Sequence, residues 1–114
     1  MIQSKIFSEE GGVCLIDDMS ITTNVWERMQ GLIGKPQLAP NQGLMLSSCN
    51  SVHTFGMKYD LDVIFLNKNK KIVKLVERLK PMRVSFCLNA VDTLELNSGV
   101  IKSLELNLND YVYW

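Results

Sequence analysis

The stretch that most constrains the fold is Leu61 to Leu66, with the sequence Leu-Asp-Val-Ile-Phe-Leu. It is too continuously apolar for a strand with one face in water, so it predicts a central strand that is buried on both faces. Asp62 interrupts the apolar run. A carboxylate at such a position must be hydrogen-bonded, paired with a cation or open to a cavity.

Other strands are predicted on both sides of this run. Gly11-Gly12 and Asn67 to Lys70 are turn sequences, so each should join two strands as a hairpin. Asp17-Asp18 is expected to end the second strand, and Met82 to Asn89 is interpreted as a loop or a short edge strand. The other predicted strands are Ile2 to Phe7, Val13 to Ile16, Gly43 to Leu46, Lys71 to Leu79, Ala90 to Leu96 and Tyr111 to Trp114.

One helix is predicted near residue 25 and a second, shorter one between Val100 and Leu106. Asn24 followed by Glu27 resembles the capping box that begins a helix. Gly31 to Gly34 should end it. Its apolar residues recur at helical spacing and predict a face packed on the core: Val25, Met29, Leu32 and Ile33.

Length and charge narrow the class of protein. The chain has 114 residues, which suits one domain over residues 1–114. It carries 12 basic and 12 acidic side chains, so no net charge is available to hold a phosphate backbone and no nucleic-acid partner is expected. The basic cluster Lys68, Lys70 and Lys71 is better interpreted as a solvated turn.

The cysteines and the apolar runs indicate the cellular compartment of the protein. Cys14, Cys49 and Cys87 are odd in number and form no Cys-x-x-Cys pair, as is typical of reduced thiols in the cytosol. No run is long enough to cross a bilayer, and the first residues lack the apolar core of a signal peptide. A cytoplasmic protein without a membrane partner is expected.

Cys49 to Met57 holds the residues that invite a chemical role. Cys49, His53 and Met57 offer thiolate, imidazole and thioether, which together favour Cu(I). On an extended strand, however, residues four apart are separated by about 13 Å, far more than a metal site allows. Cys49 with His53 as its base would need direct contact and a third group that orients the ring. The favoured interpretation of His53 itself is a partly buried side chain bonded to a backbone carbonyl.

Two carboxylates within apolar strands raise a second question. Asp62 and Glu95 both need a partner, and Arg28 is the expected one for Asp62, since a bidentate contact would tie the helix to the sheet. One hypothesis is a structural polar network of Arg28, Asp62 and Glu95. The other is that these residues and His53 line one shallow pocket for a small polar ligand.

Several segments in order resemble the family called domain of unknown function 192 (DUF192). The resemblance implies a small, mainly β single domain, an antiparallel barrel or sandwich with one or two short helices. It implies no established activity. Asn109-Asp110 replaces the usual Gly-Asp, and a turn remains plausible because Asn tolerates a positive φ. The segments that carry the resemblance are Glu27 to Gly34 with Leu38, Gly43 to Leu46, Val52 to Met57, Leu61 to Leu66, Val91 to Gly99 and Asn109 to Val112.

Three functions follow as hypotheses. The favoured one is a non-enzymatic accessory domain that binds a small molecule or a protein through the face around His53, Phe55 and Met57. The second is a hydrolase or transferase that acts through His53 with Asp62 or Cys49. The third is soft-metal binding, although no metal and no cofactor are expected. The candidate ligand-binding residues are Arg28, His53, Phe55, Met57, Asp62 and Glu95.

Overall fold

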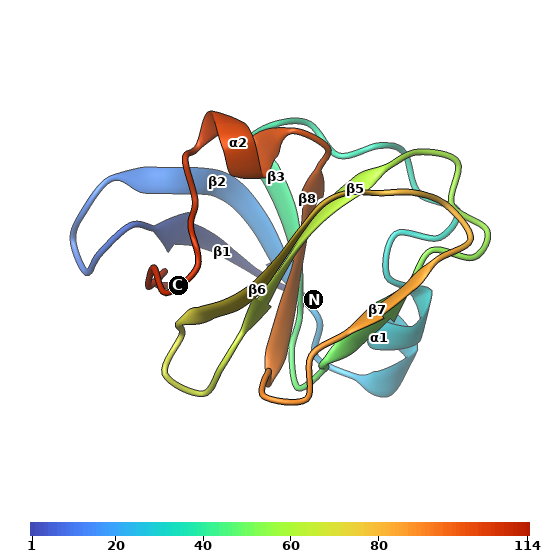
Figure 1. Cartoon of the computed structure of the whole chain (residues 1–114), viewed down its shortest axis with the longest axis horizontal. Helices are drawn as coiled ribbons and strands as arrows, with labels where there is room; N and C mark the ends of the chain where they lie inside the picture. Colours follow the sequence, from blue (N-terminus) through green and yellow to red (C-terminus); the bar gives the residue numbers. More distant parts are fainter.

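A curled six-stranded sheet organises the computed structural model, which describes residues 1–114 (Figure 1). The strand order is β1-β2-β3-β8-β5-β6. A mainly β fold with two short helices was the expectation, and it is confirmed. The strands of this sheet are β1 (Ile2–Phe7), β2 (Cys14–Ile21), β3 (Gln42–Leu46), β5 (Leu61–Leu66), β6 (Ile72–Leu79) and β8 (Asp92–Asn97).

The expected antiparallel sheet needs one correction, because β2 and β3 run parallel. The other neighbouring pairs of this sheet are antiparallel. Asp17-Asp18 does not end β2 as predicted. The strand continues to Ile21 because both carboxylates stay at the surface, where they accept hydrogen bonds from the side chains of Asn41 and Gln42.

β5 is buried along its whole length, as predicted from its apolar run. It lies between β8 and β6, however, so it is next to the edge strand and not at the centre of the sheet. β3 and β8 occupy the centre. A continuous apolar run indicates that both faces of a strand are buried. A strand next to the edge strand can also be buried in this way when both faces of the sheet are covered.

Each face of the sheet carries its own apolar core. Asp62 is opposite Leu96 and Val63 is opposite Glu95, so Asp62 and Glu95 project from opposite faces. The first core contains Ile64, Leu66, Leu94 and Leu96 and is covered by α2 (Val100–Ser103) and the C-terminal segment. The second core contains Leu44, Leu46, Val63 and Phe65.

The C-terminal segment connects the two edges of the sheet at one end. It does not form the regular strand predicted at Tyr111 to Trp114, but makes one bridge to β1 through Tyr113 and one beside β6 through Tyr111. β1 and β6 do not pair with each other, so the sheet is not a closed barrel. The arrangement is sandwich-like.

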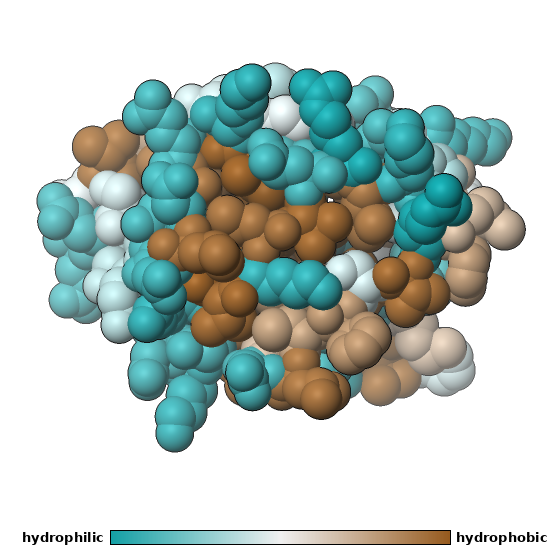
Figure 2. Space-filling model, viewed as in Figure 1, coloured by the Kyte–Doolittle hydropathy of each residue, from teal (hydrophilic) through white to brown (hydrophobic).

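A second, two-stranded sheet covers the second core. It pairs β4 (Ser51–His53) with β7 (Val84–Phe86), and only the β7 region was a predicted edge strand. Lys74 of β6 fastens the two sheets together, because its Nζ donates a 2.8 Å hydrogen bond to the carbonyl oxygen of Phe86. Apolar side chains show on the face that carries β6 and β7 (Figure 2). Neither helix of the fold is long and apolar enough to span a bilayer.

Helix α1 (Val25–Gln30) begins and ends where the sequence predicts. The side chain of Asn24 accepts a 2.9 Å hydrogen bond from the amide of Glu27, and Gly31 ends the helix. Glu27 reaches back to the amide of Thr23, one residue before the expected capping-box partner. The predicted core-facing side is wrong: Val25 and Met29 are 51% and 64% exposed, and only Leu32, beyond the helix, is buried.

Replacing Asn24 with alanine should lower the free energy of unfolding by about 1 kcal/mol, because the first turn of α1 loses its cap. Chemical denaturation followed by circular dichroism measures the change. Asn50→Ala is the matched control, since Asn50 is exposed and its side chain makes no hydrogen bond within the chain. Equal stability of the two variants would contradict a capping role for Asn24.

Candidate functional site

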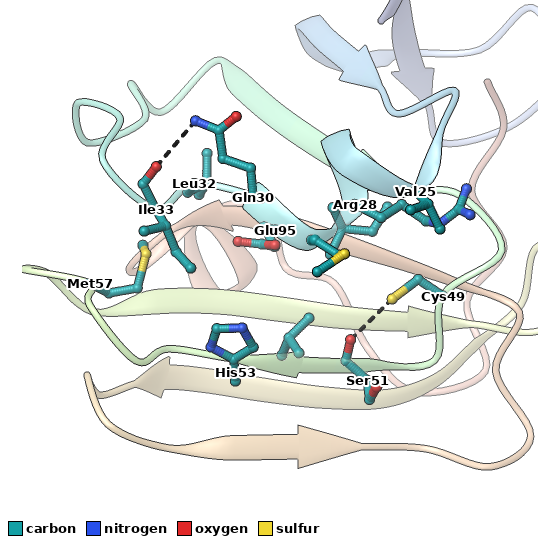
Figure 3. Close-up of a pocket in the computed structure, with 14 residues that line it drawn as sticks. Val25, Arg28, Gln30, Leu32, Ile33, Cys49, Ser51, His53, Met57 and Glu95 are labelled. Carbon is teal, nitrogen blue, oxygen red and sulfur yellow. Dashed lines mark hydrogen bonds between the residues drawn. The ribbon is translucent and has the colours of Figure 1, made fainter.

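A pocket of about 450 Å³ lies between α1 and β4, over the second face of the sheet (Figure 3). We call it the α1–β4 pocket. Its walls are mostly apolar, and its polar side chains are Arg28, Gln30, Cys49, Ser51, His53 and Glu95. The apolar lining consists of Val25, Met29, Leu32, Ile33, Leu46, Val52 and Met57.

Glu95 lies in this pocket without a partner from the chain. It is only 5% exposed, and no protein group donates a hydrogen bond to its carboxyl group. Every fully enclosed side-chain oxygen or nitrogen of the structure has a hydrogen-bond partner. The unbonded oxygens of Glu95 must therefore open onto the pocket.

Burial raises the pKa of Glu95 from 4.5 to about 7, because a charged carboxylate is poorly solvated there, while the positive charge of Lys35 acts in the opposite direction. The pKa of Tyr59 is also raised, first by burial and then by the negative charge of Glu95. Glu95 thus changes its protonation close to neutral pH, which distinguishes it from ordinary surface carboxylates.

Gly31, at the end of α1, lies close to the carboxyl group of Glu95. Its φ of +51° is a left-handed conformation that side chains disfavour. A Cβ atom at this position would lie 3.3 Å from the Oε1 atom of Glu95. The glycine therefore ends the helix and also lets the backbone approach the carboxyl group closely.

His53 lines the pocket from β4. Its ring is stacked on Phe55, with ring centroids 5.3 Å apart and an interplanar angle of 28°. Phe55 itself is 47% exposed and is not part of the pocket lining. Phe55 can therefore support the orientation of His53 and does not face the cavity itself.

Arg28, Met57 and Cys49 also line the pocket. In Figure 3 the guanidinium of Arg28 is turned toward the Cys49 side and away from Glu95. Met57 is almost fully buried. The thiol of Cys49 donates to the carbonyl oxygen of Ser51 at 3.1 Å, so its proton already has an acceptor.

Asp62 lies outside the pocket, and the expected ion pair with Arg28 is wrong. Its buried carboxylate accepts hydrogen bonds from the backbone amides of Arg78, Gly99 and Ile101, at 2.9, 3.0 and 2.9 Å. The sheet register is the physical reason: α1 covers the face of Glu95, and Asp62 points to the other face. Arg28, Asp62 and Glu95 therefore do not form one network.

The positions of Cys49, His53 and Met57 bear on the soft-metal hypothesis. Cys49, His53 and Met57 all line the pocket. No three side chains among the His, Cys, Asp and Glu residues are grouped so that they could hold a metal ion. The pocket is therefore better described by its single buried carboxyl group than by a set of metal ligands.

The sequence did not predict the contribution of Val25, Met29 and Gly31 to the pocket. Val25 and Met29 have the helical spacing of a core face, and nothing local shows that a cavity lies below them. Gly31 carried a usable signal, because a glycine at a helix end also allows close backbone approach.

Comparisons with known proteins agree with the fold. A solved structure of a protein of unknown function from Novosphingobium aromaticivorans is 16% identical, with a TM-score of 0.77, and the match covers 99% of this chain and 84% of that one. A putative transcription regulator from Sinorhizobium meliloti is 20% identical, with a TM-score of 0.79 and coverage of 96% and 89%. At such identities the likeness establishes the fold alone.

No curated protein matches the chain in sequence. A family model, DUF192, described as an uncharacterized ACR, matches residues 7–114. This match covers nearly the whole chain and agrees with the resemblance seen in its ordered segments. The chain therefore belongs to the DUF192 family, whose function is uncharacterised.

Proposed function

We propose that the protein binds a small molecule in the α1–β4 pocket. The volume of about 450 Å³ falls within the usual range for ligand sites, and the lining has the usual form of apolar walls with a few polar groups. His53 and Met57, from the stretch singled out in the sequence, contribute to it. Phe55 contributes through its stacking on His53.

The observation that carries this proposal is the unpartnered carboxyl group of Glu95. Burying a carboxyl group without a hydrogen bond destabilises a fold. Asp62, the other carboxylate within an apolar strand, meets this requirement with three amide donors, whereas Glu95 has none. A polar group that opens onto an apolar cavity is suited to orient a ligand there.

Screening small fragments by amide chemical-shift NMR tests the proposal. Bound fragments should shift the amides of α1, β4 and Glu95. Met29→Trp, which enlarges an exposed side chain of the pocket wall, should weaken binding by about tenfold or more, equivalent to about 1.4 kcal/mol. Leu88→Trp is the matched control, since Leu88 is 81% exposed and not part of the lining.

Three results would overturn this function. The first is a set of fragments whose shifts cluster away from α1, β4 and Glu95. The second is equal binding by wild type, Met29→Trp and Leu88→Trp. Loss of binding in both tryptophan variants would point to a general surface effect and would also contradict a role of the pocket.

A further inference from the structure

We infer that the ligand of the α1–β4 pocket is a small amphipathic amine, whose ammonium group pairs with Glu95 and whose apolar body packs against α1. This inference rests on the proposed function and adds the chemical class of the ligand. It follows from the absence of a cationic partner for Glu95 within the chain and from the apolar side chains that line the pocket.

The chain supplies no cation for Glu95. The single ion pair of the structure joins the N-terminal ammonium group to Glu27, which does not line the pocket. Lys35 influences Glu95 through its charge but does not come within ion-pair distance. Arg28, on α1, turns its guanidinium away from Glu95 (Figure 3). No cationic group of the chain therefore forms an ion pair with this carboxylate.

An ionised carboxylate only accepts hydrogen bonds, so its complement must be a donor. A cationic donor gives stronger hydrogen bonds than a neutral one, and the gain increases where water is excluded. An ammonium group can donate to Glu95 and keep the rest of the ligand available for apolar contact. A carboxylate ligand would instead be repelled.

The wall of α1 fits the apolar part of such a ligand. Val25 and Met29 are half-exposed or more and line the pocket, although their helical spacing is typical of a packed face. On the opposite side the wall contains Val52 and Met57. Methionine side chains adapt to ligands of different shape, so this wall can accept apolar groups of several shapes.

The pairing predicts a definite pH dependence. The pKa of Glu95, raised to about 7, means that amine binding must displace a proton at lower pH. An alkyl ammonium group stays protonated between pH 6 and 8, so its affinity should rise about tenfold over this range as Glu95 ionises. The other charged or titratable groups around Glu95 or in the same pocket are Arg28 and Lys35, the thiol of Cys49, His53 on β4, and Tyr59.

The test uses matched sets of amine, alcohol and carboxylic acid on the same apolar bodies, for example phenylethyl, cyclohexylmethyl and hexyl. Binding is measured by NMR at pH 6 and pH 8. We expect the amines to bind most tightly at pH 8 and about tenfold more weakly at pH 6. Glu95→Gln should remove both the preference for amines and their pH dependence. His53→Gln should keep the pH dependence.

The outcomes separate this inference from the proposed function. If alcohols or acids bind in the pocket at least as tightly as amines, the amine class is wrong and ligand binding stands. If the pH dependence of amines persists in Glu95→Gln or disappears in His53→Gln, pairing with Glu95 is wrong. If no compound of any set shifts the amides of α1, β4 or Glu95, the inference and the proposed function both fail.

Discussion

Replacing Asp62 with alanine is expected to lower the free energy of unfolding by about 4 kcal/mol. The side chain is fully buried and accepts hydrogen bonds from three backbone amides, those of Arg78, Gly99 and Ile101. Alanine would leave all three donors without this acceptor. Gly99 is the N-cap residue of α2 and has no side chain to cap it, and Ile101 lies in its first turn, so the helix would also lose its cap.

Chemical denaturation at neutral pH measures this effect, with Asp60→Ala as the matched control. Asp60 is partly exposed and its side chain makes no hydrogen bond, so its removal should change stability by less than about 0.5 kcal/mol. Asp62→Asn should fall between the two. It keeps the acceptor for Arg78 but can present an amide donor toward Gly99 and Ile101. Equal stability of Asp62→Ala and Asp60→Ala would show that the three bonds contribute little.

The different roles of Asp62 and Glu95 show how far the sequence could lead. Both stand out as carboxylates in apolar strands, and each needs a hydrogen bond, a cation or a cavity. Which answer applies depends on the register between β5 and β8, which places the two residues on opposite faces. It also depends on the turn after β8 that brings Gly99 beside Asp62. These long-range relations leave no trace in local patterns.

Elements determined by local sequence were predicted, whereas those determined by long-range pairing were missed. The burial of Leu61 to Leu66 can be predicted from its apolar composition. The ends of α1 can be predicted from Asn24 and Gly31, because capping and helix termination depend on local backbone chemistry. β4 has three residues and becomes a strand only through its pairing with β7. A segment of that length has too few side chains to show a period.

The sequence could not predict which side of α1 faces the core. The spacing of Val25 and Met29 is that of a core-facing helix, yet both side chains are largely exposed and line the pocket. A six-residue helix has too little surface to determine its own orientation. Leu32, after the helix, supplies the buried anchor. The stripe that the sequence assigns to the core is therefore partly available to a ligand.

Replacing Glu95 with glutamine is expected to stabilise the protein by about 3 kcal/mol at pH 8 and by less than about 1 kcal/mol at pH 5. The pKa of Glu95 is about 7 in the folded protein and 4.5 as its ordinary value. Between these values the folded state binds more protons than the unfolded state, so the stability of the wild type falls as pH rises. Glutamine has nearly the same size and no charge to bury.

The measurement compares free energies of unfolding at pH 5 and pH 8 for wild type, Glu95→Gln and the exposed control Glu77→Gln. Glu27 does not complicate this range, because hydrogen bonds to Thr23 and to the N-terminus lower its pKa to about 2. If Glu95→Gln shows the same change with pH as wild type, the carboxyl group is not buried at a cost. A pH-dependent difference confined to Glu95→Gln would instead identify a group that destabilises the free protein. A cationic ligand would then relieve the same penalty on binding, so the substitution that stabilises the fold should weaken amine binding.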